Sequence, residues 1–163
     1  MKPLEHLKAL AMEAQRKKYP NFPENARPQP TYKVKTANGL TKAIVDFIRF
    51  SGGQAERISV TGRYVDNTKV VTDVLGHKFK IGTAKYIKSS MQTGSADISA
   101  LFQGKSLKIE VKIGKDRQSE AQRIYQQQVE SAGGVYWIVK TFEDFYEKFN
   151  QIKTMDNNHN AAR

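Results

Sequence analysis

Apolar residues recur at helical spacing in four segments of the chain. Residues 3–18 and 38–51 each place their apolar side chains on one stripe, which predicts two amphipathic helices. Ser119 precedes a third helix, predicted over 120–132, and Gln122 stands at the third position of a capping box. The stripe of this helix that we expect to be buried comprises Ala121, Ile124, Tyr125 and Ala132. A fourth helix is predicted to start near Thr141 and to bury Phe142, Phe145, Tyr146 and Phe149.

Strands are predicted where apolar and polar residues alternate. Residues 55–64 alternate in this way, with Ile58 and Val60 on one face and Thr61 on the other. Residues 69–82 are expected to form a hairpin that turns at Gly76-His77 and brings Asp73 opposite Lys80. Residues 95–102 and 107–113 flank a turn at 103–106, and pairing across it sets Asp97 opposite Lys112 and Ser99 opposite Glu110. Residues 135–139 (VYWIV) are apolar throughout, which is typical of a central strand covered on both faces.

The order of these elements predicts a single α/β domain with a mixed sheet. A strand, a helix and a further buried strand imply a right-handed parallel crossover. Four prolines hold residues 19–31 extended, so we expect an N-terminal arm and linker over 1–36, the domain over 37–152 and a flexible tail over 153–163. Two alternatives remain open for the first helix: it packs on the domain, or it is a DNA-contacting or dimer-swapped arm.

The charge of the chain favours a polyanionic partner. Among the 163 residues, 27 are Lys or Arg and 16 are Asp or Glu, a net charge of +11. Residues 1–92 hold 17 basic and 7 acidic side chains, whereas residues 93–163 hold 10 and 9. A basic half beside a balanced half favours nucleic-acid binding, with a merely solubilising surface as the alternative.

The composition also excludes several classes of protein. The absence of Cys excludes disulfides, zinc fingers and thiol catalysis. No apolar run approaches the roughly 20 residues that span a bilayer. We therefore expect an intracellular, cytoplasmic protein with no membrane partner.

One face of the hairpin predicted at residues 95–113 collects two carboxylates and a lysine. Because side chains alternate between faces, Asp97, Glu110 and Lys112 point the same way, and the opposite face is wholly apolar. Paired carboxylates can hold a divalent cation, which polarises a phosphoryl group and lowers the pKa of a bound water. The ammonium can orient that water or offset charge in the transition state. Salt bridges across a solvated sheet face are the alternative explanation.

The residues around this group resemble the PD-(D/E)XK nuclease signature, and in particular its VRR-NUC branch. Five segments carry the resemblance in the family's order: GSADI (94–98), IEVK (109–112), RQSEAQRIY (117–125), Gly133-Gly134 and VYWIV (135–139). The resemblance covers residues 38–150. It implies a restriction-endonuclease-like mixed β-sheet flanked by helices, to which this chain adds a basic β-hairpin insertion and an N-terminal helical arm.

The resemblance also assigns roles to residues. Asp97 and Glu110 resemble the metal-binding acids, the carbonyl of Val111 a third ligand, Lys112 the catalytic lysine, and Gln122 a glutamine beside the active site. The implied cofactor is Mg²⁺, with Mn²⁺ able to substitute. The implied activity is that of an endonuclease that cuts branched, flapped or junction DNA, such as a Holliday junction, as a homodimer. Standalone proteins of this size resemble phage and mobile-element members, so action in a bacterial host is expected.

Phosphate contacts are expected from basic residues elsewhere in the chain. Arg57 and Arg63 match basic positions on the family's first strand, and Lys78 and Lys80 lie in the hairpin at 69–82. For each of these residues an inert place on an exposed strand is equally compatible with the sequence.

The first helix departs from the family's pattern. Many relatives carry a Glu there, near the metal, whereas the only acid between Asn38 and Phe50 is Asp46, which we expect to face solvent. Glu56 is a weaker substitute. The number of metals, one or two, therefore stays open, and a non-catalytic nucleic-acid-binding protein with the same fold is the alternative function.

Overall fold

The computed structural model describes residues 1–59, 62–89 and 92–160, with side chains up to residue 153. Val60 and Thr61, two of the residues in the predicted strand 55–64, lie outside the described residues. The chain divides into two units, one made of Met1–Ile58 with Gly94–Arg163 and the other of Ser59–Thr93. We call the first the sheet domain, and we call residues 62–89 of the second the ribbon.

The sheet domain is a mixed α/β structure, as predicted. Its strands follow the order β1-β6-β7-β8, antiparallel except for the parallel pair β7 and β8. Its elements in chain order are α1 (Pro3–Lys18), η1 (Glu24–Ala26), α2 (Ala37–Phe50), β1 (Gln54–Arg57), β6 (Ile98–Phe102), β7 (Lys105–Val111), α3 (Glu120–Ser131), β8 (Val135–Val139) and α4 (Phe142–Asn160). No described helix is long and apolar enough to cross a bilayer.

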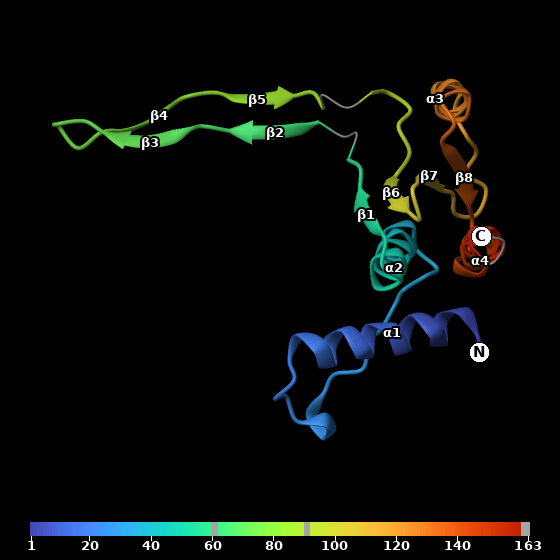
Figure 1. Ribbon diagram of the computed structural model, residues 1–163. Helices are drawn as coiled ribbons and strands as arrows, with labels where there is room; N and C mark the ends of the chain where they lie inside the picture. The colour runs from blue at the N-terminus through green and yellow to red at the C-terminus, as the bar shows by residue number, and fades with distance from the viewer. Residues whose placement is uncertain (60–61, 90–91, 161–163) are drawn as a thin grey trace. The chain divides into compact units, whose positions relative to one another are not determined.

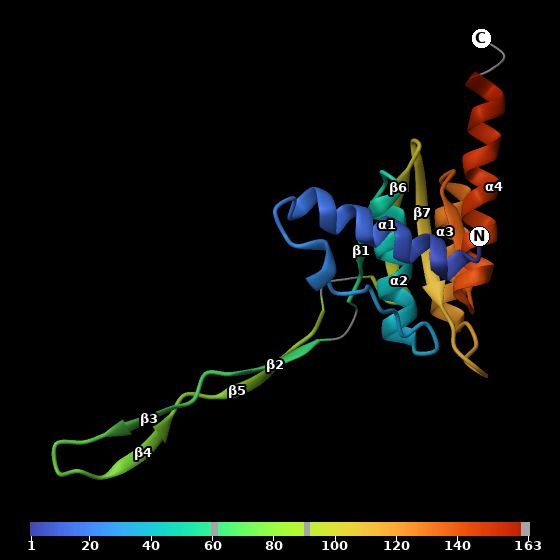
Figure 2. The ribbon, with the colours of Figure 1, turned by 90° about the horizontal axis from the view of Figure 1, so that it is seen from below.

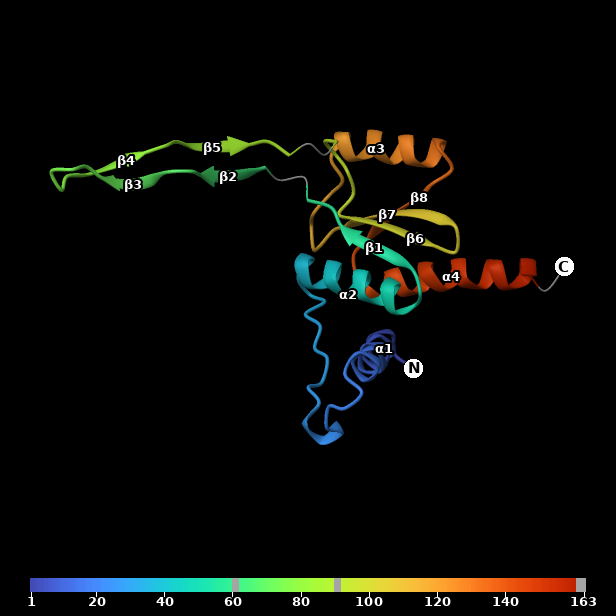
Figure 3. The ribbon, with the colours of Figure 1, turned by 60° about the vertical axis from the view of Figure 1, so that its left-hand side comes forward.

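The sheet separates two layers of helices. Helices α2 and α4 cover one face, with α1 packed against both of them, and α3 lies on the other face (Figures 1 and 3). The core lies between the sheet and α2 and α4, where the apolar face predicted for β6 and β7 is buried. Its largest fully buried side chains are Phe47, Phe142, Phe145, Phe149, Leu7, Leu40, Ile44, Ile48, Ile98, Leu107, Ile109 and Val139.

Helix α1 belongs to this core. Leu7 is completely buried, and His6 makes a hydrogen bond of 3.0 Å with the hydroxyl of Tyr146 on α4. Of the two alternatives for the first helix, packing on the domain is therefore the one that the structure shows. At the other end of the chain, α4 continues to Asn160, beyond residue 153 where a tail was expected.

Three predictions about individual elements are wrong. Strand β8 is at the edge of the sheet, so it is not a central strand. No residue of α3 is buried, and Ile124 is half-exposed, because this helix lies over the polar face of the sheet. Tyr125 is only partly covered and meets the ring of Tyr136 edge-on, with 6.2 Å between the centroids. The predicted strand 55–64 is not continuous, since β1 ends at Arg57.

The ribbon consists of two antiparallel ladders that follow one another along the same pair of chain segments (Figure 2). Strand β2 (Arg63–Asp66) pairs with β5 (Ala84–Ile87), and β3 (Lys69–Thr72) pairs with β4 (Lys78–Ile81). The hairpin predicted at 69–82 is therefore present. Its predicted pairing is wrong, because Lys80 lies opposite Val70 and Asp73 bonds to His77 through the backbone.

Candidate metal site

The turn between β6 and β7 sets the positions of the acidic residues. Gln103 and Gly104 both have positive φ, 48° and 74°, which makes a two-residue turn of the kind that suits a tight hairpin. Phe102 therefore pairs with Lys105, whereas the sequence predicted a pair with Leu107. The predicted register was wrong by two residues, and because the side-chain period is two, every residue keeps its predicted face.

Asp97 therefore lies opposite Glu110 rather than Lys112. The ladder pairs Ile98 with Ile109, and one further step along it brings the two acids together. Asp97 Oδ2 accepts a hydrogen bond of 2.8 Å from the backbone N–H of Val111. Since the N–H and C=O of a strand residue point toward the same neighbouring strand, the carbonyl of Val111 is directed to the Asp97 side.

Glu110 is fixed by two partners on one of its carboxylate oxygens. Gln122 on α3 donates to Oε1 at 2.5 Å, and the ammonium of Lys112 lies 3.0 Å from the same atom. The other oxygen, Oε2, is buried and has no hydrogen-bond partner within the described part of the chain. Glu110 is only 2% exposed, so this oxygen is a buried acceptor that a cation or a water would satisfy.

Lys112 bridges two acids. Its Nζ lies 3.0 Å from Oε1 of Glu110 and 3.3 Å from Oδ2 of Asp116, whose side chain is exposed. Lys112 itself is 7% exposed. The group thus runs from the buried carboxylate of Glu110 through the covered ammonium of Lys112 to the exposed carboxylate of Asp116. Asp97, the remaining acid of the group, is partly exposed.

The electrostatics of the group favour binding of a positive ion at Glu110. Burial raises the pKa of Glu110, and the charge of Asp97 raises it further, while Lys112 and Gln122 only partly offset these effects. Burial alone would lower the pKa of Lys112, but the contacts with Glu110 and then Asp116 outweigh burial and raise it. Lys112 is therefore held as a cation beside a carboxyl group that favours its proton or another positive charge.

Tyr136 is a member of the site that the sequence pattern did not indicate. Its hydroxyl is buried and, like Glu110 Oε2, has no hydrogen-bond partner among the described residues. Burial raises the pKa of Tyr136, and the nearby charges of Glu110 and Asp97 add to the rise. Gln118 approaches the hydroxyl and partly offsets this rise, without the geometry of a hydrogen bond. The only sequence signal was a hydroxyl within an otherwise apolar strand.

The residues present fit a divalent cation with protein oxygens on one side. The available oxygens are the Asp97 carboxylate, Oε2 of Glu110 and the carbonyl of Val111, which are hard ligands of the type that Mg²⁺ and Mn²⁺ prefer. The described residues contain no cluster of three or more His, Asp or Glu side chains placed to hold a metal. Glu56, which pairs with Ser99 on the same face of the sheet, does not complete such a cluster.

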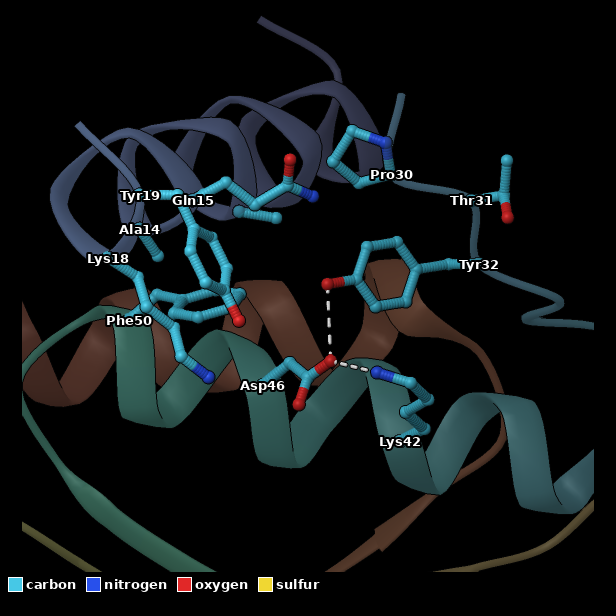
Figure 4. A pocket seen from close by; sticks show the side chains of 11 residues that line it. Ala14, Gln15, Lys18, Tyr19, Pro30, Thr31, Tyr32, Lys42, Asp46 and Phe50 are labelled. Atoms are coloured by element: carbon cyan, nitrogen blue, oxygen red, sulfur yellow. Dashed lines mark hydrogen bonds and ion pairs between the residues drawn. The ribbon is translucent and has the colours of Figure 1, made fainter. Parts of the chain in front are cut away.

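The acid of the first helix is used elsewhere, as Figure 4 shows. Asp46 accepts from the hydroxyl of Tyr32 at 3.2 Å and forms an ion pair with Lys42, in a pocket that α1 and the linker help to line. Its side chain is mostly covered, so the expectation that it faces solvent is wrong. Asp46 therefore stabilises the packing of the linker on α2 and makes none of the described contacts of Glu110.

The predicted phosphate-binding residues fall in different places. Arg57 pairs with Ile98, on the face opposite to Asp97, and its guanidinium donates to Asn38 at 2.8 Å. Arg63, Lys78 and Lys80 belong to the ribbon, where all three are exposed. The structure therefore brings Asp97, Glu110, Lys112, Val111 and Gln122 together and leaves these four basic residues outside the group.

Comparison of the chain with protein-family models and with curated proteins finds no match.

Proposed function

We propose that the protein is a metal-dependent phosphodiesterase, an endonuclease that acts on structured DNA. One observation carries the proposal: Asp97, directly before β6, lies one step beyond the Ile98–Ile109 pair and therefore beside Glu110 of β7. A lysine is bonded to one oxygen of Glu110, and the other oxygen is buried without a partner among the described residues. The resemblance to the VRR-NUC branch of the PD-(D/E)XK nucleases and its restriction-endonuclease-like fold supports the same assignment.

In this proposal the chain's own groups have separate tasks. Asp97, Oε2 of Glu110 and the carbonyl of Val111 would hold Mg²⁺ or Mn²⁺, which supplies Lewis-acid polarisation of a phosphodiester and a water of lowered pKa. Lys112 places a fixed positive charge beside that position, where it offsets negative charge that grows on the phosphoryl oxygens. Gln122 holds Glu110 Oε1, so that Oε2 is the oxygen left for the ion.

DNA is the proposed substrate because of the distribution of charge. The sheet domain and the ribbon together carry the excess of +11, and the exposed lysines of the ribbon provide contacts to phosphate without any dependence on base sequence. Recognition of branched or flapped DNA by shape fits such a surface, and two copies of the chain would place two sites on opposite strands of a junction.

A second candidate function is favoured by one specific observation. Glu110 and Lys112 are 2% and 7% exposed, so cleavage requires a phosphate to reach two side chains that are almost fully covered. A nucleic-acid-binding protein that keeps the fold without hydrolysis has no such requirement. The two candidates differ in whether any Mg²⁺-dependent cleavage occurs.

The test is cleavage of labelled four-way junction, flap, duplex and single-stranded DNA in Mg²⁺ or Mn²⁺. The proposal expects cleavage of the branched substrates by the wild type and a loss of roughly 10²-fold or more in Asp97→Asn and Glu110→Gln. Glu56→Gln is the matched control, because it removes an exposed acid from the same face of the sheet. Equal cleavage by all four proteins would refute the assignment, and binding without cleavage by the wild type would select the second candidate.

A further inference from the structure

The ribbon has no core of its own. None of its described residues is buried, and an isolated pair of strands is at best marginally stable in water. Large apolar side chains are nevertheless abundant on it. Of the thirteen exposed large hydrophobic residues described for the chain, eight lie in the ribbon: Tyr64, Val70, Val74, Leu75, Phe79, Ile81, Tyr86 and Ile87. Both properties indicate that the ribbon works in contact with another molecule.

Charge identifies that molecule as a polyanion. The ribbon carries six basic side chains, Arg63, Lys69, Lys78, Lys80, Lys85 and Lys88, against two acids, for a net +4. Both acids are used within turns: Asp66 accepts from the backbone N–H of Thr68, and Asp73 accepts from those of Leu75 and His77. Within the described residues none of the six cations forms an ion pair.

The tip of the ribbon presents two aliphatic side chains in a fixed loop. The backbone N–H of Asp73 bonds to the carbonyl of His77 at 2.9 Å, and Oδ1 of Asp73 accepts from two backbone N–H groups of the loop at 2.9 and 2.8 Å. Gly76 has a φ of 85°, which closes the turn. Val74 and Leu75 are thereby held outward, 102% and 78% exposed.

We propose that the ribbon is a DNA-deforming arm. Its cations contact phosphates on both sides of the minor groove, while Val74 and Leu75 enter between adjacent base pairs and bend the duplex. Apolar wedges flanked by basic residues unstack base steps in this way. The inference rests on the proposed function only in taking DNA as the partner, and it explains how a shape-selective nuclease would favour sites that bend easily, such as junctions and flaps.

The distribution of charge along the ribbon favours DNA over a lipid surface. Arg63 and Asp73 are ten residues apart, a length of about 33 Å at about 3.3 Å per residue, close to one turn of B-DNA. Cations occur from the tip end, at Lys78 and Lys80, to the opposite end, at Arg63, Lys85 and Lys88. A loop that inserts into a membrane needs cations only near its tip, whereas a groove offers phosphates along the whole ribbon.

The experiment measures binding and bending of a 30-base-pair duplex labelled at both ends, in EDTA so that no cleavage occurs. Binding is followed by anisotropy and bending by energy transfer between the ends. The test variant is the double substitution Val74→Ser and Leu75→Ser, which changes only fully or largely exposed side chains. Val70→Thr is the matched control, because Val70 is an exposed apolar residue of the strand away from the tip. A second variant, Lys78→Gln with Lys80→Gln, tests the phosphate contacts.

The wild type and Val70→Thr should bend the duplex. The tip variant should bind it about 10-fold more weakly and leave it straight. The lysine variant should reduce the slope of log affinity against log salt concentration by about two, because two phosphate contacts are lost. Bending that is unchanged in the tip variant overturns the inference. Preferential binding to phosphatidylserine vesicles over DNA would also overturn it. The same holds if the tip substitutions change only the oligomeric state of the protein. Bending without Mg²⁺-dependent cleavage would leave the inference standing and remove the proposed function, and cleavage without bending would do the reverse.

Discussion

Gln122 links the start of helix α3 to the buried acid of the sheet. Its Nε2 donates to Oε1 of Glu110 at 2.5 Å, and its own Oε1 accepts from the backbone N–H of Ser119 at 2.9 Å, which completes the capping box of α3. One side chain therefore caps the helix and fixes the carboxylate. The alternatives considered from the sequence, a cap or a glutamine beside the site, are both present in the structure.

Removal of Gln122 should weaken metal binding more than it weakens the fold. Gln122→Ala frees Glu110 Oε1, and loss of a group that orients a ligand typically lowers metal affinity about 10- to 100-fold. Ser119→Ala is the matched control, because it breaks the same cap at a cost of about 1 kcal/mol and leaves Glu110 alone. Titration of Mn²⁺ by calorimetry checks this, and equal affinities of the two variants would contradict the role given to Gln122.

Metal affinity should increase with pH. The pKa of Glu110 in the folded protein lies above its ordinary value of 4.5, so below that folded pKa the metal must displace a proton. The folded state keeps this proton in a pH range where the unfolded state has lost it. This contribution to the stability of the metal-free protein is therefore complete below 4.5 and is lost as pH rises through the folded pKa.

Thermal unfolding across a pH series, with and without Mn²⁺, measures both effects. The stabilisation by Mn²⁺ should grow with pH and level off above the folded pKa of Glu110. Glu110→Gln should remove both the metal effect and this pH dependence. Stabilisation by Mn²⁺ that is independent of pH in the wild type would show that Glu110 is not a ligand.

Lys112 should be needed for cleavage and not for metal binding. Lys112→Met removes the ammonium that competes for Glu110, so Mn²⁺ should bind at least as tightly, while the rate of cleavage falls roughly 10²- to 10⁴-fold. Lys108→Met is the control, since Lys108 is on the same strand and face but bonds to Ser99 at 2.6 Å. Single-turnover cleavage and Mn²⁺ titration on both variants check this, and a Lys112→Met protein that cuts at the wild-type rate is the contrary outcome.

Tyr136 should affect activity and stability in opposite directions. Tyr136→Phe removes a buried hydroxyl that has no partner among the described residues, so the metal-free protein should become more stable by about 1 kcal/mol. We expect the hydroxyl to donate to the bound phosphate or to the attacking water, so its removal should lower the rate of cleavage at least about 10-fold. Tyr125→Phe removes the hydroxyl of a neighbouring, partly exposed residue and should change neither quantity. Urea unfolding and cleavage assays decide, and a destabilised Tyr136→Phe protein would contradict this account.

Helix α1 should contribute to the stability of the sheet domain. Leu7 is completely buried against the core, so Leu7→Ala should lower the free energy of unfolding by about 2–5 kcal/mol. Lys8→Ala, an exposed neighbour, should change it by less than about 0.5 kcal/mol. Urea denaturation measures both, and equal midpoints for Leu7→Ala and the wild type would show that α1 is a detachable arm.

For strands β6 and β7, the sequence was sufficient to assign residues to faces and insufficient to assign partners. Alternation with a period of two placed Asp97, Glu110 and Lys112 on one face, and a shift of two residues leaves that result unchanged. The register itself depends on Gln103, a residue other than glycine with positive φ, for which only the following Gly104 gave a signal.

Apolar strands were a second source of error. The run VYWIV indicated burial on both faces, yet β8 is an edge strand, with Trp137 against Phe145 and Tyr136 beside the acids. Hydrophobicity cannot distinguish a tyrosine that fills an apolar core from one whose buried hydroxyl lies near charged groups, because the difference lies in which residues the fold brings beside the hydroxyl. The positions of the helices were easier to predict, because the signals that start and end a helix are local in sequence, although the stripe predicted for α3 is not buried.

The decisive test of the proposed metal site is the anomalous difference density of a crystal soaked in Mn²⁺. We expect one peak between the Asp97 carboxylate, Oε2 of Glu110 and the carbonyl of Val111, and no such peak in crystals of Glu110→Gln. A soaked wild-type crystal that diffracts well and shows no manganese at that position, with Lys112 still bonded to Glu110, would show that these oxygens do not hold a metal ion.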